Sequence, residues 1–198
     1  MRCEELADHP EFRALDDIAG IEVDLRYTGT NNFVGHVLYG GLDCRYLHRH
    51  AATALERCVA RLAQQAPGHR LRVLDALRPH RIQVQLWHEL PPPLRAYLAD
   101  PARGSIHSFG MAVDVTVVDP AGRELDMGAG FDEMTERSHP VKEAEHLTSG
   151  VLSPQHVTNR QLLRDAMAAG GFQGIWNEWW HFDLGDRAQV RATYVRVE

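Results

Sequence analysis

The chain contains 198 residues, 44% of them hydrophobic, which is enough for one globular domain with a substantial core. Its formal net charge is −6 and its basic residues are scattered, so it lacks the basic patch of a nucleic-acid-binding protein. No apolar stretch approaches the roughly 18 residues of a membrane span. Three cysteines without CxxC spacing indicate free thiols in a reducing compartment. The acidic, polar start has no secretory signal, so we expect a cytoplasmic protein unless a leader has been removed.

The first half of the chain predicts a strand, a loop, a helix, a strand and a second helix. Alternating apolar and charged residues indicate the first strand, and a Gly- and Asn-rich segment indicates the loop. Apolar residues at helical spacing predict the first helix, which Pro67-Gly68 ends. Three consecutive prolines end the second helix. The predicted bounds are 21–27, 28–41, 45–66, 71–77 and 80–90.

The second half predicts a hairpin, a long loop, a helix and a closing strand. The hairpin turns at "DPAG", where Pro and Gly suit a type I turn. Ser153-Pro154 has the composition of a helix start, and Gly170-Gly171 that of a helix end. This order predicts one α+β domain over residues 1–198, with a central antiparallel sheet and helices packed against it. The predicted bounds are 110–118 and 123–128 for the hairpin, 131–153 for the loop, 153–169 for the helix and 178–184 for the last strand.

Two segments combine polar groups that are costly to bury with strongly apolar neighbours. In "SIHSFGMAVD", His107 and Asp114 are seven residues apart, so they would face opposite sides of one continuous strand. Gly110 can adopt a positive φ and turn the chain between them. We therefore expect His107 on a loop and Asp114 on the adjoining strand.

The second segment is "NEWWHFDL", near the C-terminus. In a strand, Trp179, His181 and Asp183 would share one face. Glu178 lies three residues before His181, so it would join His181 only from a bend where the strand begins. Trp179 and Trp180 are interpreted as packing residues that hold this polar pair rigid, rather than as substrate contacts.

Two histidines and one aspartate form a zinc ligand set that leaves a fourth position for water. A nearby glutamate that is not a ligand would then be the general base. The alternative is chance, because a chain with twelve histidines will contain accidental clusters. A second metal site is not predicted, since no ligand spacing links Cys44, His48, His50 and His139.

At these motifs the chain resembles the D-alanyl-D-alanine dipeptidases, within the wider group of zinc D,D-peptidases. "SIHSFGMAVD" is similar to their Ser-x-His-x-x-Gly-x-Ala-x-Asp pattern, and "EWWHFD" to their Glu-x-x-His segment. Further similar stretches follow in the family's order: "DLRYTGTNNFVG", "DALRP", "DMGAGFDEM" and "SHP…NRQLLRDAMAAGGF". The resemblance implies the zinc D,D-peptidase fold, also described as hedgehog/DD-peptidase-like.

The resemblance also implies a role for eight residues. His107, Asp114 and His181 would bind one zinc ion. Glu178 would be the catalytic base, and Arg78 would stabilise the developing oxyanion. The remaining three would contact the substrate: Asp132 would hold its ammonium group, and Ser105 and Tyr27 would line the pocket.

Three of these residues also have purely structural interpretations. Arg78 could be a surface residue at a strand end, Asp132 could cap a turn, and Tyr27 could belong to the core. Leu77 stands where the family often has Tyr, which leaves the shape of the pocket open.

The implied activity is hydrolysis of the small dipeptide D-alanyl-D-alanine to two D-alanines. Two alternatives remain open at this point. One is a zinc D,D-carboxypeptidase or peptidoglycan endopeptidase that acts on longer peptides. The other is a zinc-binding module without catalysis, which would be expected to lack the Glu or the Arg.

Overall fold

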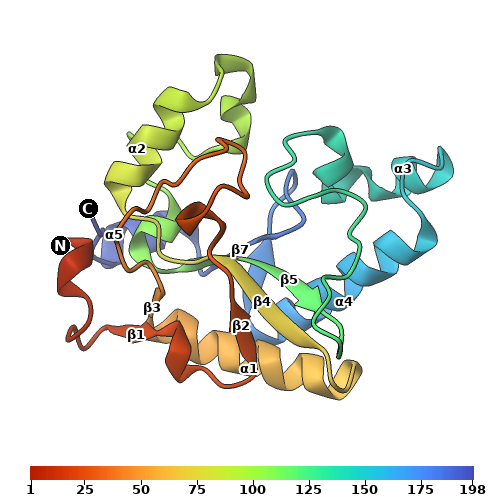
Figure 1. The fold of residues 1–198 in the computed structure, drawn as a ribbon, viewed down its shortest axis with the longest axis horizontal. Coiled ribbons are helices and arrows are strands. Elements are labelled where there is room, and N and C mark those ends of the chain that lie inside the picture. Colours follow the sequence, from red (N-terminus) through yellow and green to blue (C-terminus); the bar gives the residue numbers. More distant parts are fainter.

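Strand β5, Ala112–Val118, is the centre of a five-stranded sheet with the order β2-β4-β5-β7-β6. The computed structural model describes residues 1–198 (Figure 1). All seven residues of β5 are buried, as expected of a strand that is covered on both faces. The other strands of this sheet are β2 Ile21–Val23, β4 Arg70–Asp75, β6 Phe172–Gly174 and β7 His181–Leu184.

The α+β class is confirmed, but the sheet is not wholly antiparallel. Strand β2 pairs parallel with β4, whereas the pairs β4–β5, β5–β7 and β6–β7 are antiparallel. A separate two-stranded sheet joins β1, Phe12–Ala14, to β3, Tyr46–His48. The parallel pair arises because the long segment between β2 and β4 includes a crossover helix.

Helices α1, Arg49–Gln65, and α4, Pro154–Gly170, pack on each other and against the sheet (Figure 1). Gly170 permits their close approach, because a Cβ there would lie 2.5 Å from the Ala54 carbonyl oxygen. The remaining helices are α2 His80–Glu89, α3 Glu143–Thr148 and α5 Arg187–Thr193. None of the helices has the length and hydropathy that a membrane crossing requires.

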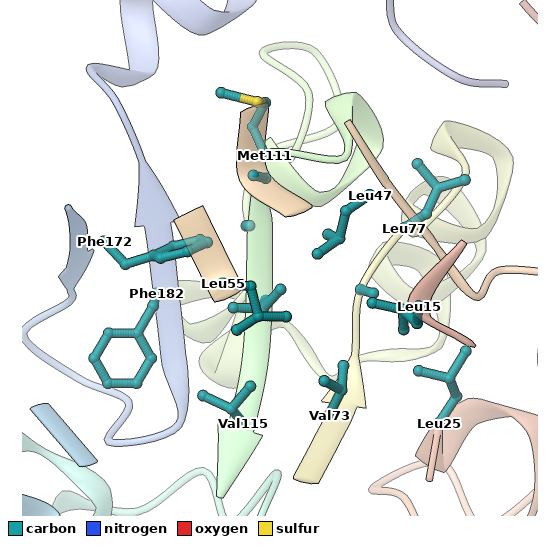
Figure 2. Close-up of a cluster of buried hydrophobic side chains, with 14 of the residues drawn as sticks. Leu15, Leu25, Leu47, Leu55, Val73, Leu77, Met111, Val115, Phe172 and Phe182 are labelled. Atoms are coloured by element: carbon teal, nitrogen blue, oxygen red, sulfur yellow. The ribbon is translucent and has the colours of Figure 1, made fainter. Parts of the chain in front are cut away.

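One hydrophobic core joins the sheet to α1 (Figure 2). Val73 of β4 and Val115 of β5 lie beside Leu55 of α1, and all three are fully buried. Phe172 and Phe182 extend the same core across β6 and β7. This core fixes the relative positions of β4, β5 and β7, the three strands that carry the polar cluster.

Several predicted elements differ from the structure. The strand predicted over 21–27 ends at Val23, and Tyr27 lies in a 3-10 turn, η3, Arg26–Thr28. The predicted partner strand over 123–128 forms only one isolated bridge, Val118 to Glu124. The loop predicted over 131–153 contains α3. Elements β1, β3, β6 and α5 were not predicted; they are short, and packing against the rest of the domain stabilises them more than local propensity does.

Candidate active site

Three polar residues form one row across the middle of the sheet. Strand register places Asp75 of β4 opposite Asp114 of β5, and Asp114 opposite His181 of β7. His107 joins them from the 3-10 turn η5, Ile106–Phe109, which ends at Gly110 with φ of 63°. The predicted placement is confirmed: His107 is on a turn, Asp114 is on the strand, and Gly110 takes a left-handed conformation between them.

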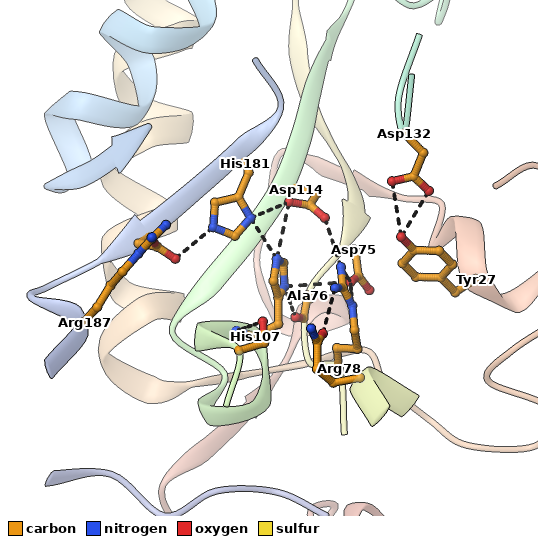
Figure 3. Close-up of polar contacts among 12 residues, drawn as sticks. Tyr27, Asp75, Ala76, Arg78, His107, Asp114, Asp132, His181 and Arg187 are labelled. Carbon is orange, nitrogen blue, oxygen red and sulfur yellow. Dashed lines mark hydrogen bonds and ion pairs between the residues drawn. The ribbon is translucent and has the colours of Figure 1, made fainter. Parts of the chain in front are cut away.

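The side chains of His107, Asp114 and His181 converge on one point (Figure 3). His107 Nε2 lies 3.1 Å from His181 Nδ1 and 3.3 Å from Asp114 Oδ1. His181 Nδ1 lies 3.0 Å from the same Asp114 oxygen. Ligands about 2.0–2.2 Å from a tetrahedral zinc are roughly 3.3–3.5 Å apart. The three atoms therefore fit one zinc ion with little movement.

Neighbouring groups orient both imidazole rings. His107 Nδ1 lies 2.7 Å from the carbonyl oxygen of Ala76, so it is the donor and leaves Nε2 free to act as a ligand. His181 Nε2 lies 2.8 Å from Asp183 Oδ1, and Arg187 donates to the other Asp183 oxygen at 2.6 Å. Such outer contacts fix the tautomer and the orientation of metal-binding histidines.

Neighbouring charges lower the pKa values of the two carboxylates in this cluster, Asp114 and Asp183. Burial would raise the pKa of Asp114, but the adjacent His107 and His181 lower it below its usual range. Burial also opposes ionisation of Asp183, yet His181 and Arg187 lower its pKa to about 2. Both carboxylates are therefore anionic at neutral pH, which suits Asp114 to bind a cation and Asp183 to accept hydrogen bonds.

Glu178 precedes β7 in an irregular segment, as the parity argument predicts. Its side chain lines the same cavity as the three converging side chains, and the residue is only 9% exposed. Burial, followed by the nearby Asp114 and Asp132, raises the pKa of Glu178 to about 8, although His181 opposes the shift. A carboxyl group whose pKa lies near neutrality is suited to general acid–base chemistry.

Arg78 is not a surface residue, because it is buried and held on several sides. Its guanidinium donates from Nε to Asp75 at 2.9 Å and from Nη1 to Gln83 at 3.1 Å, and Nη2 lies 3.4 Å from Asp114. Tyr39 donates its hydroxyl to the fully buried Asp75. The guanidinium is thus rigidly placed while still lining the cavity.

Asp132 is the only non-glycine residue with a positive φ, at 59°. Asp tolerates this conformation better than most residues, and such strain is often stored at functional sites. Tyr27 donates its hydroxyl to both Asp132 oxygens, at 3.2 and 3.0 Å (Figure 3). Although Asp132 keeps partial access through the cavity, burial and then Asp114 raise the pKa of its carboxyl to about 7. A cation bound beside Asp132 would lower this pKa again and so favour the ionised carboxylate.

The other residues singled out by the sequence occupy distinct positions. Ser105 is buried beside the cavity, and its hydroxyl accepts a hydrogen bond from the His107 amide at 3.3 Å. Trp180 lines the cavity and packs edge-on against Phe131, whereas Trp179 donates to the Ala129 carbonyl at 3.1 Å. The packing interpretation therefore suits Trp179 better than Trp180.

All eight residues implied by the family resemblance line one cavity of about 290 Å³; they are Tyr27, Arg78, Ser105, His107, Asp114, Asp132, Glu178 and His181. Leu77 belongs to the core and does not line the cavity. The histidines and cysteine rejected as a second metal site form no ligand cluster.

Sequence reasoning assigned no role to Asp75, Gln83 or Arg187, although Asp75 opens the "DALRP" motif. A carboxylate at the end of β4, directly after the buried Val73 and Leu74, was the available signal for Asp75. Asp183 was placed on the same face as His181, but its contact with that ring was not predicted. Gln83 and Arg187 lie on helices without a local pattern that would reveal their contacts.

Comparisons with known proteins identify the family of this chain. The profile of the peptidase M15 family, described as D-ala-D-ala dipeptidase, matches residues 9–198. The D-alanyl-D-alanine dipeptidase of Escherichia coli (strain K12) is 42% identical over 168 residues, which cover 85% of this chain and 81% of that protein. The proteins of the same name from Enterococcus faecalis and Streptomyces coelicolor are 31% and 32% identical, covering 88% of this chain and 92% and 91% of theirs.

Among solved structures, an LD-carboxypeptidase aligns with 93% of this chain and 72% of its own, at 15% identity and a TM-score of 0.47. The family resemblance seen in the motifs is confirmed by the family profile and by the sequence relatives. The chain therefore belongs to the peptidase M15 family, a family of zinc metallopeptidases.

Proposed function

We propose that this protein is a zinc-dependent dipeptidase that hydrolyses D-alanyl-D-alanine to two D-alanines. The observation that carries the proposal is the shared cavity: it brings a three-ligand cluster, a buried carboxyl of raised pKa and an enclosed second carboxylate within one small volume. At about 290 Å³ the cavity is just below the ~300–1,000 Å³ typical of ligand sites. A substrate of two alanines suits this size.

His107, Asp114 and His181 would hold one zinc ion through Nε2, Oδ1 and Nδ1, the three atoms that converge. When bound, zinc supplies Lewis-acid chemistry: it polarises a carbonyl and makes water a stronger acid. The cation would also lower the pKa of the neighbouring Glu178 from about 8, because a nearby positive charge favours the ionised carboxylate.

Glu178 would accept the proton of the attacking water and later deliver it to the leaving amine. Arg78 would donate to the scissile carbonyl oxygen as negative charge develops there. Its contacts with Asp75 and Gln83 hold it in place before the substrate arrives, so no reorganisation is needed during the reaction. Ser105 would contribute by fixing the turn that carries His107 and by lining the pocket.

Asp132 would bind the free ammonium of the substrate, with Tyr27 orienting its carboxylate. An N-blocked peptide has no charge at this point, and its amide would leave the enclosed carboxylate without a cation. Removing one partner of a buried charge pair is strongly destabilising, by about 3–5 kcal/mol. This supports a dipeptidase over a carboxypeptidase or endopeptidase that takes longer peptides. A non-catalytic zinc module is disfavoured by the presence of both Glu178 and Arg78.

The test is a comparison of three substrates on zinc-loaded protein: D-Ala-D-Ala, L-Ala-L-Ala and N-acetyl-D-Ala-D-Ala. We expect turnover of the first, with the acetylated peptide poorer by about 10³ in kcat/KM, the equivalent of roughly 4 kcal/mol. Comparable cleavage of the free and acetylated peptides would favour the carboxypeptidase or endopeptidase alternative. Absence of turnover with every peptide would favour the non-catalytic module.

The cytoplasmic location expected from the sequence remains a proposal. All three cysteines are unpaired and buried, which is typical of a protein kept in a reducing compartment. Fractionation of cells of the source organism tests this placement, and recovery of the protein outside the cytoplasm would contradict it.

A further inference from the structure

Three arginines gather at one end of the cavity. Arg187 and Arg191 lie one turn apart on α5, and Arg103 lies on the turn that precedes Ser105. All three line the cavity that contains the zinc ligands. None of them was singled out by sequence motifs, because the fold brings together two segments more than eighty residues apart in the chain.

The three positive charges are incompletely neutralised by the protein. Arg187 is paired with Asp183 at 2.6 Å. Arg191 donates only to backbone carbonyls, those of Gly104 at 3.0 Å and Arg187 at 3.4 Å. Arg103 is exposed, and its side chain has neither a hydrogen bond nor an ion pair within the chain. Like charges one helical turn apart repel each other, and a bound anion would offset this repulsion.

The carboxylates near these arginines are largely engaged elsewhere. Asp183 bridges His181 and Arg187, and Asp186 caps α5 through the amides of Ala188 and Gln189. Asp100 accepts from the Ala102 amide at 2.9 Å and so closes the turn that carries Arg103. Burial, and then repulsion from Arg187, lowers the pKa of Arg191 below its usual value. An additional negative group would favour the charged form of Arg191 and so oppose this lowering of its pKa.

The position of this basic end relative to the rest of the site is informative. In Figure 3, Arg187 and Asp132 lie on opposite sides of the cluster formed by His107, Asp114 and His181. The cavity therefore has Asp132 on one side of the three converging side chains and Arg187 on the other. Arg191 lies with Arg187 on α5 and contacts Gly104, next to Arg103. A free dipeptide is a zwitterion with the same polarity, an ammonium at one end and a carboxylate at the other, and its peptide bond lies between the two charges.

We propose that Arg103 and Arg191 form the subsite for the free carboxylate of the substrate, with Arg187 holding Asp183 beside them. This inference rests on the proposed function and extends it, because the enzyme would then recognise both ends of its substrate. The ammonium would bind at Asp132 and the carboxylate at the arginines. Peptides extended at the C-terminus would be excluded for the same physical reason as those blocked at the N-terminus.

The experiment compares D-Ala-D-Ala with D-alanyl-D-alaninamide, which has almost the same size but no terminal carboxylate. The unmodified enzyme should prefer the acid by about 10- to 100-fold in kcat/KM, the effect of one charge-assisted hydrogen bond. Arg103→Gln should raise KM for the acid while leaving kcat nearly unchanged, and it should leave the amide almost unaffected. Arg191→Lys should retain more of the preference than Arg191→Gln, because it keeps the charge.

Arg61→Gln is the matched control, since Arg61 is exposed on α1, has no side-chain partner and lies outside the cavity. It removes the same charge and should leave the ratio of acid to amide unchanged. If D-Ala-D-Ala is cleaved but the ratio is near one, or is unchanged in both Arg103→Gln and Arg191→Gln, the arginine subsite is wrong while the dipeptidase proposal stands. If neither substrate is cleaved, the proposed function fails, and the subsite with it.

Discussion

Asp183 connects His181 to Arg187: its Oδ1 lies 2.8 Å from His181 Nε2, and its Oδ2 accepts from Arg187 Nε at 2.6 Å. The carboxylate is buried and its pKa is lowered to about 2, so it is an anion throughout the neutral range. It holds the ring so that Nδ1 faces Asp114 and His107. The strength of the metal site should therefore depend on a residue that does not touch the metal.

Asp183→Asn should weaken zinc binding by about 10- to 100-fold, the usual effect of removing an outer partner of a histidine ligand. The asparagine keeps the shape but provides no charge to favour the required tautomer. Competition with a chelating dye measures the affinity. Asp165→Asn on the exposed face of α4 is the control and should bind zinc normally. An unchanged affinity in Asp183→Asn would show that the fold alone orients His181.

Glu178→Gln should bind zinc as tightly as the unmodified protein but lose roughly 10²–10⁴ in kcat, the contribution of a positioned acid–base group. Gln is nearly the same size and cannot accept the proton of water. Zinc content and steady-state rates on the same preparation separate the two properties. A variant that loses its metal, and recovers full activity when zinc is added in excess, would instead make Glu178 a structural residue.

The raised pKa values of Glu178 and Asp132, about 8 and about 7, predict an unusual pH dependence for the metal-free protein. Between about pH 5 and 6 both carboxyls stay largely protonated in the folded state but ionise in the unfolded state, and Asp132 loses its proton in the folded state as the pH passes 7. The folded state then binds more protons, so the free energy of unfolding should fall as pH rises. The slope should be about 1.4 kcal/mol per pH unit for each carboxyl that remains protonated.

Urea titrations at several pH values measure how the free energy of unfolding changes with pH. Glu178→Gln should make this slope shallower, because the glutamine side chain does not titrate. Zinc should reduce the slope in the unmodified protein, because the cation lowers the pKa of Glu178 toward its ordinary value. A metal-free protein that becomes more stable from pH 5 to 7 would contradict the raised pKa values.

Arg78 is expected to stabilise both the fold, through its ion pair with Asp75, and the developing oxyanion, so that Arg78→Ala alone would not separate the two effects. It is the main charge partner of the fully buried Asp75, so Arg78→Ala should lower stability by about 3–5 kcal/mol as well as activity. Arg78→Lys keeps a charge near Asp75 but not the planar fork, and it should lower kcat by on the order of 10²–10³ with a smaller loss of stability. Thermal unfolding and steady-state rates measure the two effects. An unchanged kcat with a raised KM in Arg78→Lys would assign Arg78 to ground-state binding.

The local features of this site could be predicted because backbone geometry imposes them. The seven-residue spacing of His107 and Asp114 requires a turn, and Gly110 supplies it. The three-residue spacing of Glu178 and His181 predicts a bend, and Glu178 lies in an irregular segment with bends on either side of it. Motif spacing therefore made these residues candidates for one site, and the family resemblance predicted their roles as metal ligands and base.

Features that depend on tertiary packing could not be predicted. The alternating pattern over 21–27 suggested one strand, yet the chain leaves the sheet after Val23, and Tyr27 turns toward Asp132. Nothing local records that contact, because its partner is 105 residues away. The contact between Arg191 of α5 and the Gly104 carbonyl, 87 residues apart in sequence, is of the same kind.

Gly110 lies at the junction between the turn that carries His107 and the strand that carries Asp114. Its φ is 63°, and an added Cβ would lie 2.7 Å from the backbone nitrogen of His48 and 3.0 Å from the Phe12 ring. The His48 amide donates to the Gly110 carbonyl at 2.9 Å, so the small β1–β3 sheet cannot move away without losing that bond. Gly110→Ala should therefore suffer both backbone strain and a clash with backbone.

Gly122→Ala isolates the first of these costs, because Gly122 has a φ of 82° but nothing within 4 Å of an added Cβ. We expect Gly122→Ala to lose about 1–2 kcal/mol of stability from the left-handed conformation alone. Gly110→Ala should lose about 1–3 kcal/mol more from overpacking, and it should also weaken zinc binding because His107 and Asp114 are displaced relative to each other. Urea unfolding and zinc competition measure both quantities. Equal losses of stability in the two variants, with normal zinc affinity in Gly110→Ala, would mean that the turn tolerates the methyl group and that the ligands are held by other contacts.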